Sequence, residues 1–143
     1  MRQTHFSHRL VEYIPEVIED GVLYVSEKYG TAVHKCACGC GEEVVTPLNP
    51  TDWQVRLDTH GPTLYPSVGN WSYRCQSHYI IRNGRVVWGS KWSQAQIERE
   101  RERDFIAKQT YFGGKNRRKL KAGWNLWRNV KSAAQRWIDK LLK

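Results

Sequence analysis

The chain has 143 residues and a formal net charge of +9, which is enough sequence for one domain with a hydrophobic core and at most an appended segment. The amino-terminal residues lack the apolar core of a secretory signal, and no run of about 18 apolar residues occurs. We therefore expect a cytoplasmic protein without a membrane-spanning helix, in a compartment where disulfides are uncommon.

The positive charge is concentrated at the carboxy end. Residues 1–112 contain 13 Lys/Arg and 13 Asp/Glu, whereas residues 113–143 contain 10 Lys/Arg and a single acidic residue, Asp139. This asymmetry indicates a neutral folded body with a basic attachment.

Short runs of β-branched and aromatic residues predict strands in the first half of the chain. Pro15 blocks a long helix near the amino end. The alternation of Trp53, Val55 and Leu57 with polar residues is typical of a half-buried strand. The predicted strands cover residues 21–26, 31–36, 42–48 and 51–58.

The next segments predict turns and a hairpin. Residues 59–70 are rich in Gly and Pro and indicate a turn, a short strand and a loop. Residues 77–89 contain Asn83-Gly84, a dipeptide that suits a type I′ turn because both central residues need a positive φ. We expect the paired strands at residues 79–81 and 86–88.

After Trp92 the sequence becomes helical in character. Residues 93–105 are densely charged, and Ser93 can cap the first helix. Residues 112–123 predict a basic hinge, and apolar residues at steps of three and four predict a second helix over 124–143. The predicted regions are a zinc-binding β domain (1–92), a charged connector helix (93–112) and a basic amphipathic tail helix (113–143).

Three of the four cysteines alternate in the run HKCACGCGEE, and the fourth lies in RCQSHY. Four thiolates can bind one zinc ion tetrahedrally at about 2.3 Å, which brings the sulfurs within about 4 Å of one another. Residues two apart on a strand are separated by about 6.6 Å, so the chain must curl. Gly39 and Gly41 permit the backbone angles that this requires. The four residues are Cys36, Cys38, Cys40 and Cys75.

Histidines enlarge the set of possible ligands. His78 lies three residues after Cys75, and His34 lies two residues before Cys36. The sequence lacks the CxxC spacing of zinc knuckles and thioredoxin-type redox pairs. Reduced cysteines that only pack, or a redox pair, remain alternatives. We expect one Zn²⁺ bound by four of five groups: Cys36, Cys38, Cys40, Cys75 and His78.

The choice of ligands decides which groups stay reactive. If four cysteines close the metal site, His78 is unbound beside Ser77. Ser67 in LYPSVGNW reaches His78 if its loop folds over the hairpin, and a Ser–His pair supplies a nucleophile and a base. A zinc ion with three protein ligands would instead activate water. Ser67, Ser77 and His78 are the catalytic candidates. A turn serine at Ser67 and a structural ligand at His78 are the competing interpretations.

Three motifs occur in the order CACGCG, PSVGNW and CQSHY, and residues 10–95 resemble a bacterial family known as a domain of unknown function. Some members of that family are encoded beside ubiquitin-like modifiers and their activating and conjugating enzymes. The resemblance implies a metal-binding protein of a modifier pathway, with the modifier or its conjugating enzymes as partners and peptidase activity on the modifier. It implies a functional site at Cys36, Cys38, Cys40, Ser67, Cys75, Ser77 and His78.

The basic tail, residues 115–143, lies outside this resemblance. Its cations can bind nucleic-acid phosphates, with strong salt dependence. Its tryptophans and leucines, opposite the cations, also suit an anionic membrane surface. A third interpretation is that the apolar stripe packs on the domain or on a partner subunit. No nucleic-acid-binding motif of diagnostic spacing is present.

These observations predict an α+β protein: a small, mainly antiparallel β domain organised around a zinc site, followed by two carboxy-terminal helices. The expected function is a zinc-binding peptidase or hydrolase of a bacterial ubiquitin-like modifier pathway. The alternative is a non-catalytic module in which structural zinc stabilises the fold and the tail engages nucleic acid, anionic membrane or a protein partner.

Overall fold

The computed structural model describes the backbone of residues 1–141 and the side chains of residues 1–116 and 118. The chain divides into two compact units, Met1–Arg99 and Glu100–Lys143. Unit 1 contains two four-stranded sheets, and nearly all of the pairing within them is antiparallel. The predicted mainly antiparallel β domain is therefore confirmed.

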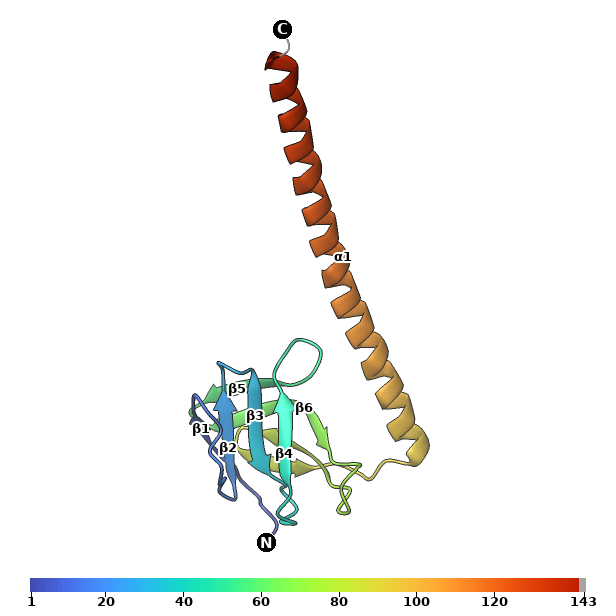
Figure 1. The fold of residues 1–143 in the computed structure, drawn as a ribbon. Coiled ribbons are helices and arrows are strands. Elements are labelled where there is room, and N and C mark those ends of the chain that lie inside the picture. The colour runs from blue at the N-terminus through green and yellow to red at the C-terminus, as the bar shows by residue number, and fades with distance from the viewer. Residues whose placement is uncertain (142–143) are drawn as a thin grey trace. The chain divides into compact units, whose positions relative to one another are not determined.

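The first sheet has the strand order β1-β2-β3-β4 (Figure 1). Its strands are β1 (Ser7–Leu10), β2 (Val22–Ser26), β3 (Thr31–Lys35) and β4 (Glu43–Pro47). The last three occupy predicted positions and pair antiparallel. β1 pairs with β2 in parallel and was not predicted, because its sequence SHRL is mostly exposed and carries little apolar signal.

The second sheet has the order β5-β6-β7-β8, and all of its pairs are antiparallel. Its strands are β5 (Gln54–Asp58), β6 (Gly61–Gly69), β7 (His78–Arg82) and β8 (Arg85–Trp88). The β7–β8 hairpin turns at Asn83 and Gly84, whose φ values of 49° and 74° are both positive, as the sequence predicts. β6 is longer than the short strand expected from its Gly and Pro content.

The two sheets share one core. The strands of the second sheet lie behind those of the first in Figure 1, and buried residues from both sheets form a single cluster. His34 on β3 is buried and bonds Tyr79 on β7 through Nε2 and Oη, 2.9 Å apart. Burial lowers the pKa of His34 to about 3, so the imidazole is neutral at this contact. The principal core residues are Phe6, Leu23, Val25, Ala32, Cys36, Ala37, Val44, Leu64, Val68, Tyr79 and Ile81.

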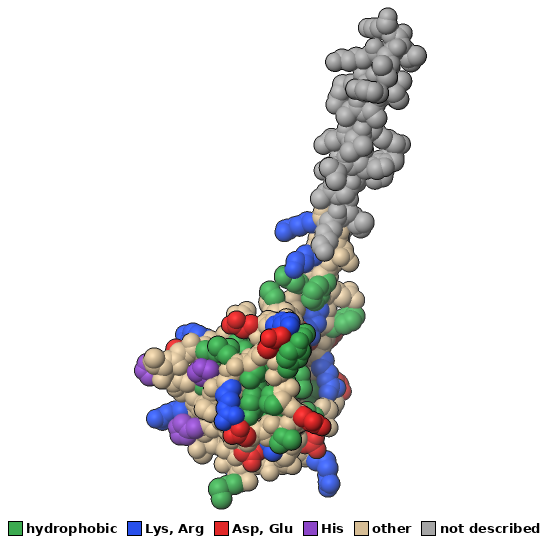
Figure 2. Space-filling model, turned by 60° about the vertical axis from the view of Figure 1, so that its left-hand side comes forward, with side chains coloured by type: hydrophobic (Ala, Val, Ile, Leu, Met, Phe, Trp, Pro, Cys, Tyr) green, Lys and Arg blue, Asp and Glu red, His purple; other side chains and the backbone are tan. Residues whose placement is uncertain are grey.

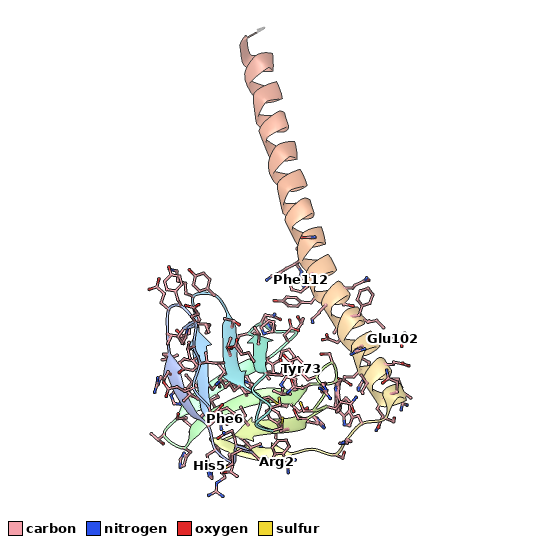
Figure 3. All side chains as sticks on the ribbon, turned by 60° about the horizontal axis from the view of Figure 1, so that its bottom comes forward. Arg2, His5, Phe6, Tyr73, Glu102 and Phe112 are labelled. Atoms are coloured by element: carbon pink, nitrogen blue, oxygen red, sulfur yellow. The ribbon has the colours of Figure 1, made fainter. Side chains whose placement is uncertain are left out.

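The amino-terminal segment connects the two sheets. The Phe6 amide donates to Gly84 O at 2.7 Å, and Thr4 O accepts from the Val86 amide at 2.9 Å. The Arg2 guanidinium lies 3.9 Å from the centre of the Trp88 ring, in the region where Figure 3 labels Arg2, His5 and Phe6. These contacts fix the β7–β8 hairpin, whose strand β7 carries His78.

One helix follows the strands, α1 (Gln94–Leu141). Ser93 caps it as predicted: Ser93 Oγ accepts from the Gln96 amide, and Gln96 Oε1 accepts from the Ser93 amide at 2.8 Å. The prediction of two helices separated by a hinge at 112–123 is wrong, because the helix continues through those residues. Glycine inside a helix costs about 1 kcal/mol relative to alanine and weakens the helix without breaking it.

The surface of unit 1 carries charges of both signs. Figure 2 shows Lys/Arg and Asp/Glu side chains interspersed with hydrophobic ones on one face, in agreement with the balanced charge of residues 1–112. Within the described part of the chain, no helix has the length and apolar character needed to cross a bilayer. The binding predicted for residues 115–143 depends on side chains that lie almost entirely outside the described ones.

Candidate functional site

The four cysteine side chains meet at one point. Their sulfur atoms all lie within 4.8 Å of one another, and all four residues are free thiols. Cys36 Sγ lies 3.4 Å from Cys38 Sγ and 3.9 Å from Cys75 Sγ, which is the spacing that one tetrahedral ion needs. Cys36 is buried with 1% of its surface exposed, whereas Cys40 is exposed.

The predicted curl of the β3–β4 connection brings the first three sulfurs together. The Gly39 amide donates to Cys36 O at 3.0 Å and closes a tight turn. Gly39 and Gly41 have φ values of +83° and +86°, a region that L residues with a side chain rarely adopt. The two glycines therefore allow alternate residues of an otherwise extended run to direct their sulfurs toward one point.

Cys75 arrives from the loop between β6 and β7. The Tyr73 hydroxyl donates to Glu43 O at 2.6 Å and fixes this loop to β4; Figure 3 labels Tyr73 there. Asn70 Nδ2 donates to Cys36 Sγ at 3.3 Å and to Ser77 Oγ at 3.0 Å. Ser77 Oγ also lies 3.1 Å from Cys36 Sγ. The two ends of the loop, Asn70 and Ser77, thus contact the cluster directly.

The local environment acts differently on the thiols. Burial raises the pKa of Cys38. Burial also opposes ionisation of Cys75, but hydrogen bonds from Ser77 and from the neighbouring sulfurs outweigh it and lower the Cys75 pKa to about 7. Donors directed at sulfur, such as Asn70 Nδ2, stabilise a thiolate. The four cysteines therefore form a group that can hold a metal ion.

Among the described residues, this group contains no histidine. His78 lies elsewhere and bonds Ser67: the Ser67 Oγ to His78 Nε2 distance is 3.0 Å. His34, the other histidine near the cysteines, bonds Tyr79 instead. The structure thus brings Ser67 and His78 together and leaves both imidazoles outside the thiol cluster.

A bulge in β6 places the Ser67 side chain. β6 pairs with β7 through Leu64↔Ile81 and Val68↔Tyr79, and the register shifts between these pairs. Three residues of β6, including Ser67, therefore lie opposite the single residue Ile80. Bulges re-aim side chains relative to a regular strand. Beyond the bulge, Gly69 pairs with His78, which brings the histidine close to the serine.

The Ser90 backbone determines the tautomer of His78. His78 Nδ1 lies 2.9 Å from Ser90 O. A carbonyl oxygen only accepts hydrogen bonds, so Nδ1 carries the proton in the neutral ring. Nε2 is then an acceptor, and the Ser67 hydroxyl donates to it. This is the arrangement in which a histidine can remove the proton of a serine nucleophile.

Two tryptophans and a glycine surround the His78 ring. The ring centres of Trp71 and Trp92 lie 5.2 Å and 4.9 Å from that of His78, and the two indoles stack on each other at 5.3 Å. A Cβ added at Gly89 would lie 2.5 Å from His78 Nδ1, so only glycine leaves room for the ring here. The absence of a side chain at Gly89 leaves room for the ring, and the two indoles restrict it to the orientation in which it bonds Ser67.

The three catalytic candidates from the sequence separate into two places. Ser67 and His78 bond each other, whereas Ser77 bonds the cysteine cluster. Sequence reasoning missed Asn70, Trp71 and Trp92, although Asn70 and Trp71 stand in the PSVGNW motif, which could have drawn attention to them. The sequence could not reveal the Ser90 carbonyl as a partner of His78, because every residue has a backbone carbonyl.

The site therefore combines a serine hydroxyl bonded to an oriented histidine with a separate group of four cysteines that can hold a metal ion. A family model described as "bacterial ubiquitination-like system serine protease (BubE)" matches residues 10–89. The chain therefore belongs to this family, as the resemblance in the sequence indicates. No curated protein and no solved structure matches the chain.

Proposed function

We propose that the chain is a serine peptidase that hydrolyses the bond after the carboxy-terminal residue of a ubiquitin-like modifier, either to mature the modifier or to release it from conjugates. The 3.0 Å bond between Ser67 Oγ and His78 Nε2 carries this proposal. Membership of a family of proteases from bacterial ubiquitination-like systems supports it and makes the modifier or its conjugating enzymes the expected partners.

In the first half of the reaction, Ser67 Oγ attacks the carbonyl carbon of the scissile bond while His78 Nε2 takes the hydroxyl proton. The carbon–oxygen bond forms, the carbon–nitrogen bond breaks, and His78 returns the proton to the leaving amine. The Ser90 carbonyl accepts from Nδ1–H throughout and keeps the ring in its productive orientation. The modifier is then an ester on Ser67.

In the second half, water replaces the amine. His78 Nε2 removes a proton from water, the water oxygen attacks the ester carbon, and the proton returns to Ser67 Oγ as the carbon–oxygen bond to the enzyme breaks. The modifier leaves with a free carboxyl group. The cycle needs no oxidant or further reactant, and it restores both side chains.

The four cysteines fit a zinc ion, and we assign it a structural role. Zinc bound by four thiolates has no open coordination position and stabilises the surrounding fold. Its ligands come from the β3–β4 turn and from the β6–β7 loop. That loop joins the strands that carry Ser67 and His78, so the cysteine cluster supports the geometry of the pair from outside it. A cytoplasmic location would keep these cysteines reduced and available to the ion.

The test is cleavage of a modifier that carries a carboxy-terminal extension, measured by intact-mass spectrometry. We expect the purified protein to release the extension, and Ser67→Ala and His78→Asn to lower the rate by at least about 10³-fold. Ser72→Ala, a change of a nearby loop serine, is the control and should retain the rate. Cleavage by Ser67→Ala at the wild-type rate would contradict the proposal and favour a non-catalytic binding module.

A further inference from the structure

We infer that the edge of β6 beside Ser67 binds the substrate as an added strand, so that the protein selects an extended peptide by its backbone. The inference rests on the proposed function and concerns how the substrate reaches Ser67. Addition of a strand to a sheet edge is a general way to bind an extended peptide, because main-chain hydrogen bonds supply affinity that does not depend on side chains.

The first observation is that β6 extends beyond its neighbour β5. The β5–β6 register runs from Asp58↔Gly61 to Gln54↔Tyr65 and ends there. β6 itself continues to Gly69. In the described part of the chain, residues 66–69 therefore have no partner strand on the side where β5 lies. An edge without a partner strand presents backbone donors and acceptors that another chain can use.

The second observation gives the direction of these backbone groups. The Asn70 amide donates to Ser77 O at 2.9 Å, across the β6–β7 pair. Backbone groups of successive strand residues point to opposite sides in an antiparallel pair. The neighbouring pair Gly69↔His78 is therefore the kind without mutual hydrogen bonds. The N–H and C=O of Gly69 point away from β7, toward the edge that lacks a partner.

The third observation is the position of the nucleophile on this edge. Ser67 lies two residues before Gly69, a separation of about 6.6 Å along a strand. A peptide residue that pairs with Gly69 therefore places a peptide bond within one or two residues of Ser67 Oγ. An extended carboxy-terminal tail can lie along the edge in this way, whereas a helix or a folded loop cannot pair with it.

The test uses Ser67→Ala protein and an eight-residue synthetic peptide that copies the carboxy-terminal end of the ubiquitin-like modifier of the same system. Amide hydrogen exchange is followed by NMR. We expect the Gly69 amide to exchange at least tenfold more slowly with the peptide bound, and the Gly113 amide to be unchanged. Peptides with one backbone N-methyl group each should show weakened binding at every second position and little change between, because alternate residues face β6.

Three results would overturn the inference: no binding of the peptide at millimolar concentration, binding without protection of Gly69, or N-methyl effects without alternation. These outcomes are distinguishable from failure of the proposed function. If wild-type protein cleaves the extended modifier through Ser67 while Gly69 stays unprotected, the catalytic assignment stands and the docking edge is wrong. If Gly69 is protected but cleavage does not depend on Ser67, the docking edge stands and the catalytic assignment is wrong.

Discussion

Two hydrogen bonds hold the His78 ring: Nδ1 donates to Ser90 O, and Nε2 accepts from the Ser67 hydroxyl. The space for the ring depends on Gly89. Gly89 has no positive φ, so backbone conformation does not require glycine there. The requirement is room, because an added Cβ would lie 2.5 Å from Nδ1 and 2.8 Å from Cε1 of His78. A ring displaced by such a Cβ would have little room to move, because Trp71 and Trp92 contact it.

We therefore predict that Gly89→Ala lowers kcat by about 10²-fold, the scale at which misplacement by about 1 Å acts. KM should change little, because the site for an extended substrate lies along β6. The measurement is steady-state cleavage of the extended modifier. Gly113→Ala is the control, since a Cβ there meets nothing within 4 Å. An unchanged kcat for Gly89→Ala would mean that the ring position is not important for the reaction.

The assignment of an orienting carbonyl at residue 90 gives a second prediction. Ser90→Ala keeps the backbone oxygen that accepts from His78 Nδ1 and removes only an exposed hydroxyl. Activity within about twofold of wild type is expected, because the bond to the His78 ring uses the Ser90 backbone oxygen and not the hydroxyl. A loss comparable to that of His78→Asn would show that the Ser90 side chain, rather than its carbonyl, takes part.

At the scale of elements, the β6–β7 unit joins the thiol cluster to the serine and histidine. β6 carries Ser67, β7 begins with His78, and the loop between them carries Asn70, Cys75 and Ser77. Asn70 lies at the centre of this connection because one amide group bonds both Cys36 Sγ and Ser77 Oγ.

Replacing Asn70 by alanine should weaken metal binding by about 10–100-fold, the range for residues that support metal ligands from outside the coordination shell. It should also destabilise the fold by about 1–3 kcal/mol, because Cys36 and Ser77 lose a buried donor. Competition with a chromophoric chelator measures the first effect and denaturant unfolding the second. Asn116→Ala, an exposed change in α1, is the control and should alter neither quantity.

Sequence patterns located most elements but not all. The strands β2, β3, β4, β5 and the β7–β8 hairpin follow from β-branched runs, alternation and Asn83-Gly84. The sequence did not predict β1, because its parallel pairing with β2 is a tertiary contact and its four residues are mostly exposed, without an apolar pattern. The sequence predicted too short a strand for β6, because Gly61, Pro62 and Pro66 usually indicate turns. In the structure these residues belong to a strand with a bulge.

The candidate site was partly predictable for a similar reason. Residue type alone points to Cys36, Cys38, Cys40 and Cys75. The positive φ of Gly39 and Gly41 brings the first three together, whereas the approach of Cys75 depends on the tertiary position of the β6–β7 loop. The pairing of Ser67 with His78 is conditional in the sequence, because it depends on where the loop folds. The carbonyl of Ser90 and the packing of Trp71 and Trp92 depend on the fold, and no local pattern specifies them.

The start of α1 provides a separate test at this scale. Ser93→Ala removes the hydroxyl that accepts from the Gln96 amide and should cost about 1 kcal/mol in the first helical turn. Amide exchange at Gln96 and Ile97 is expected to accelerate about fivefold, while exchange in β2 remains unchanged. Equal acceleration in β2 would indicate that the substitution affects the whole β unit rather than the cap.

At the scale of the whole molecule, the four-cysteine group links the two sheets. Cys36, Cys38 and Cys40 follow β3 of the first sheet, whereas Cys75 precedes β7 of the second. A bound ion would therefore add a crosslink between sheets that also contact each other through packed side chains, the His34–Tyr79 bond and the amino-terminal segment. Anything that binds only the folded state stabilises that state by mass action.

Removal of the metal with a strong chelator should lower the midpoint of thermal unfolding by more than about 10 °C and reduce cleavage in parallel. Re-addition of Zn²⁺ should restore both quantities, because the ion supports the β6–β7 loop without taking part in proton transfer. Calorimetry and the cleavage assay on the same sample are the measurements. Complete loss of activity without any change in the unfolding midpoint would instead indicate an ion in the reaction itself.

The most direct measurement of the central claim is the site of covalent modification by a fluorophosphonate, mapped by peptide mass spectrometry. Such a reagent reacts with a serine whose hydroxyl is activated by a base. The account predicts a single phosphonylated residue, Ser67, with labelling at least about 10²-fold slower in His78→Asn and unchanged in Ser90→Ala. Absence of label on Ser67, or equal labelling in His78→Asn, would contradict the assignment of Ser67 as nucleophile and His78 as its base.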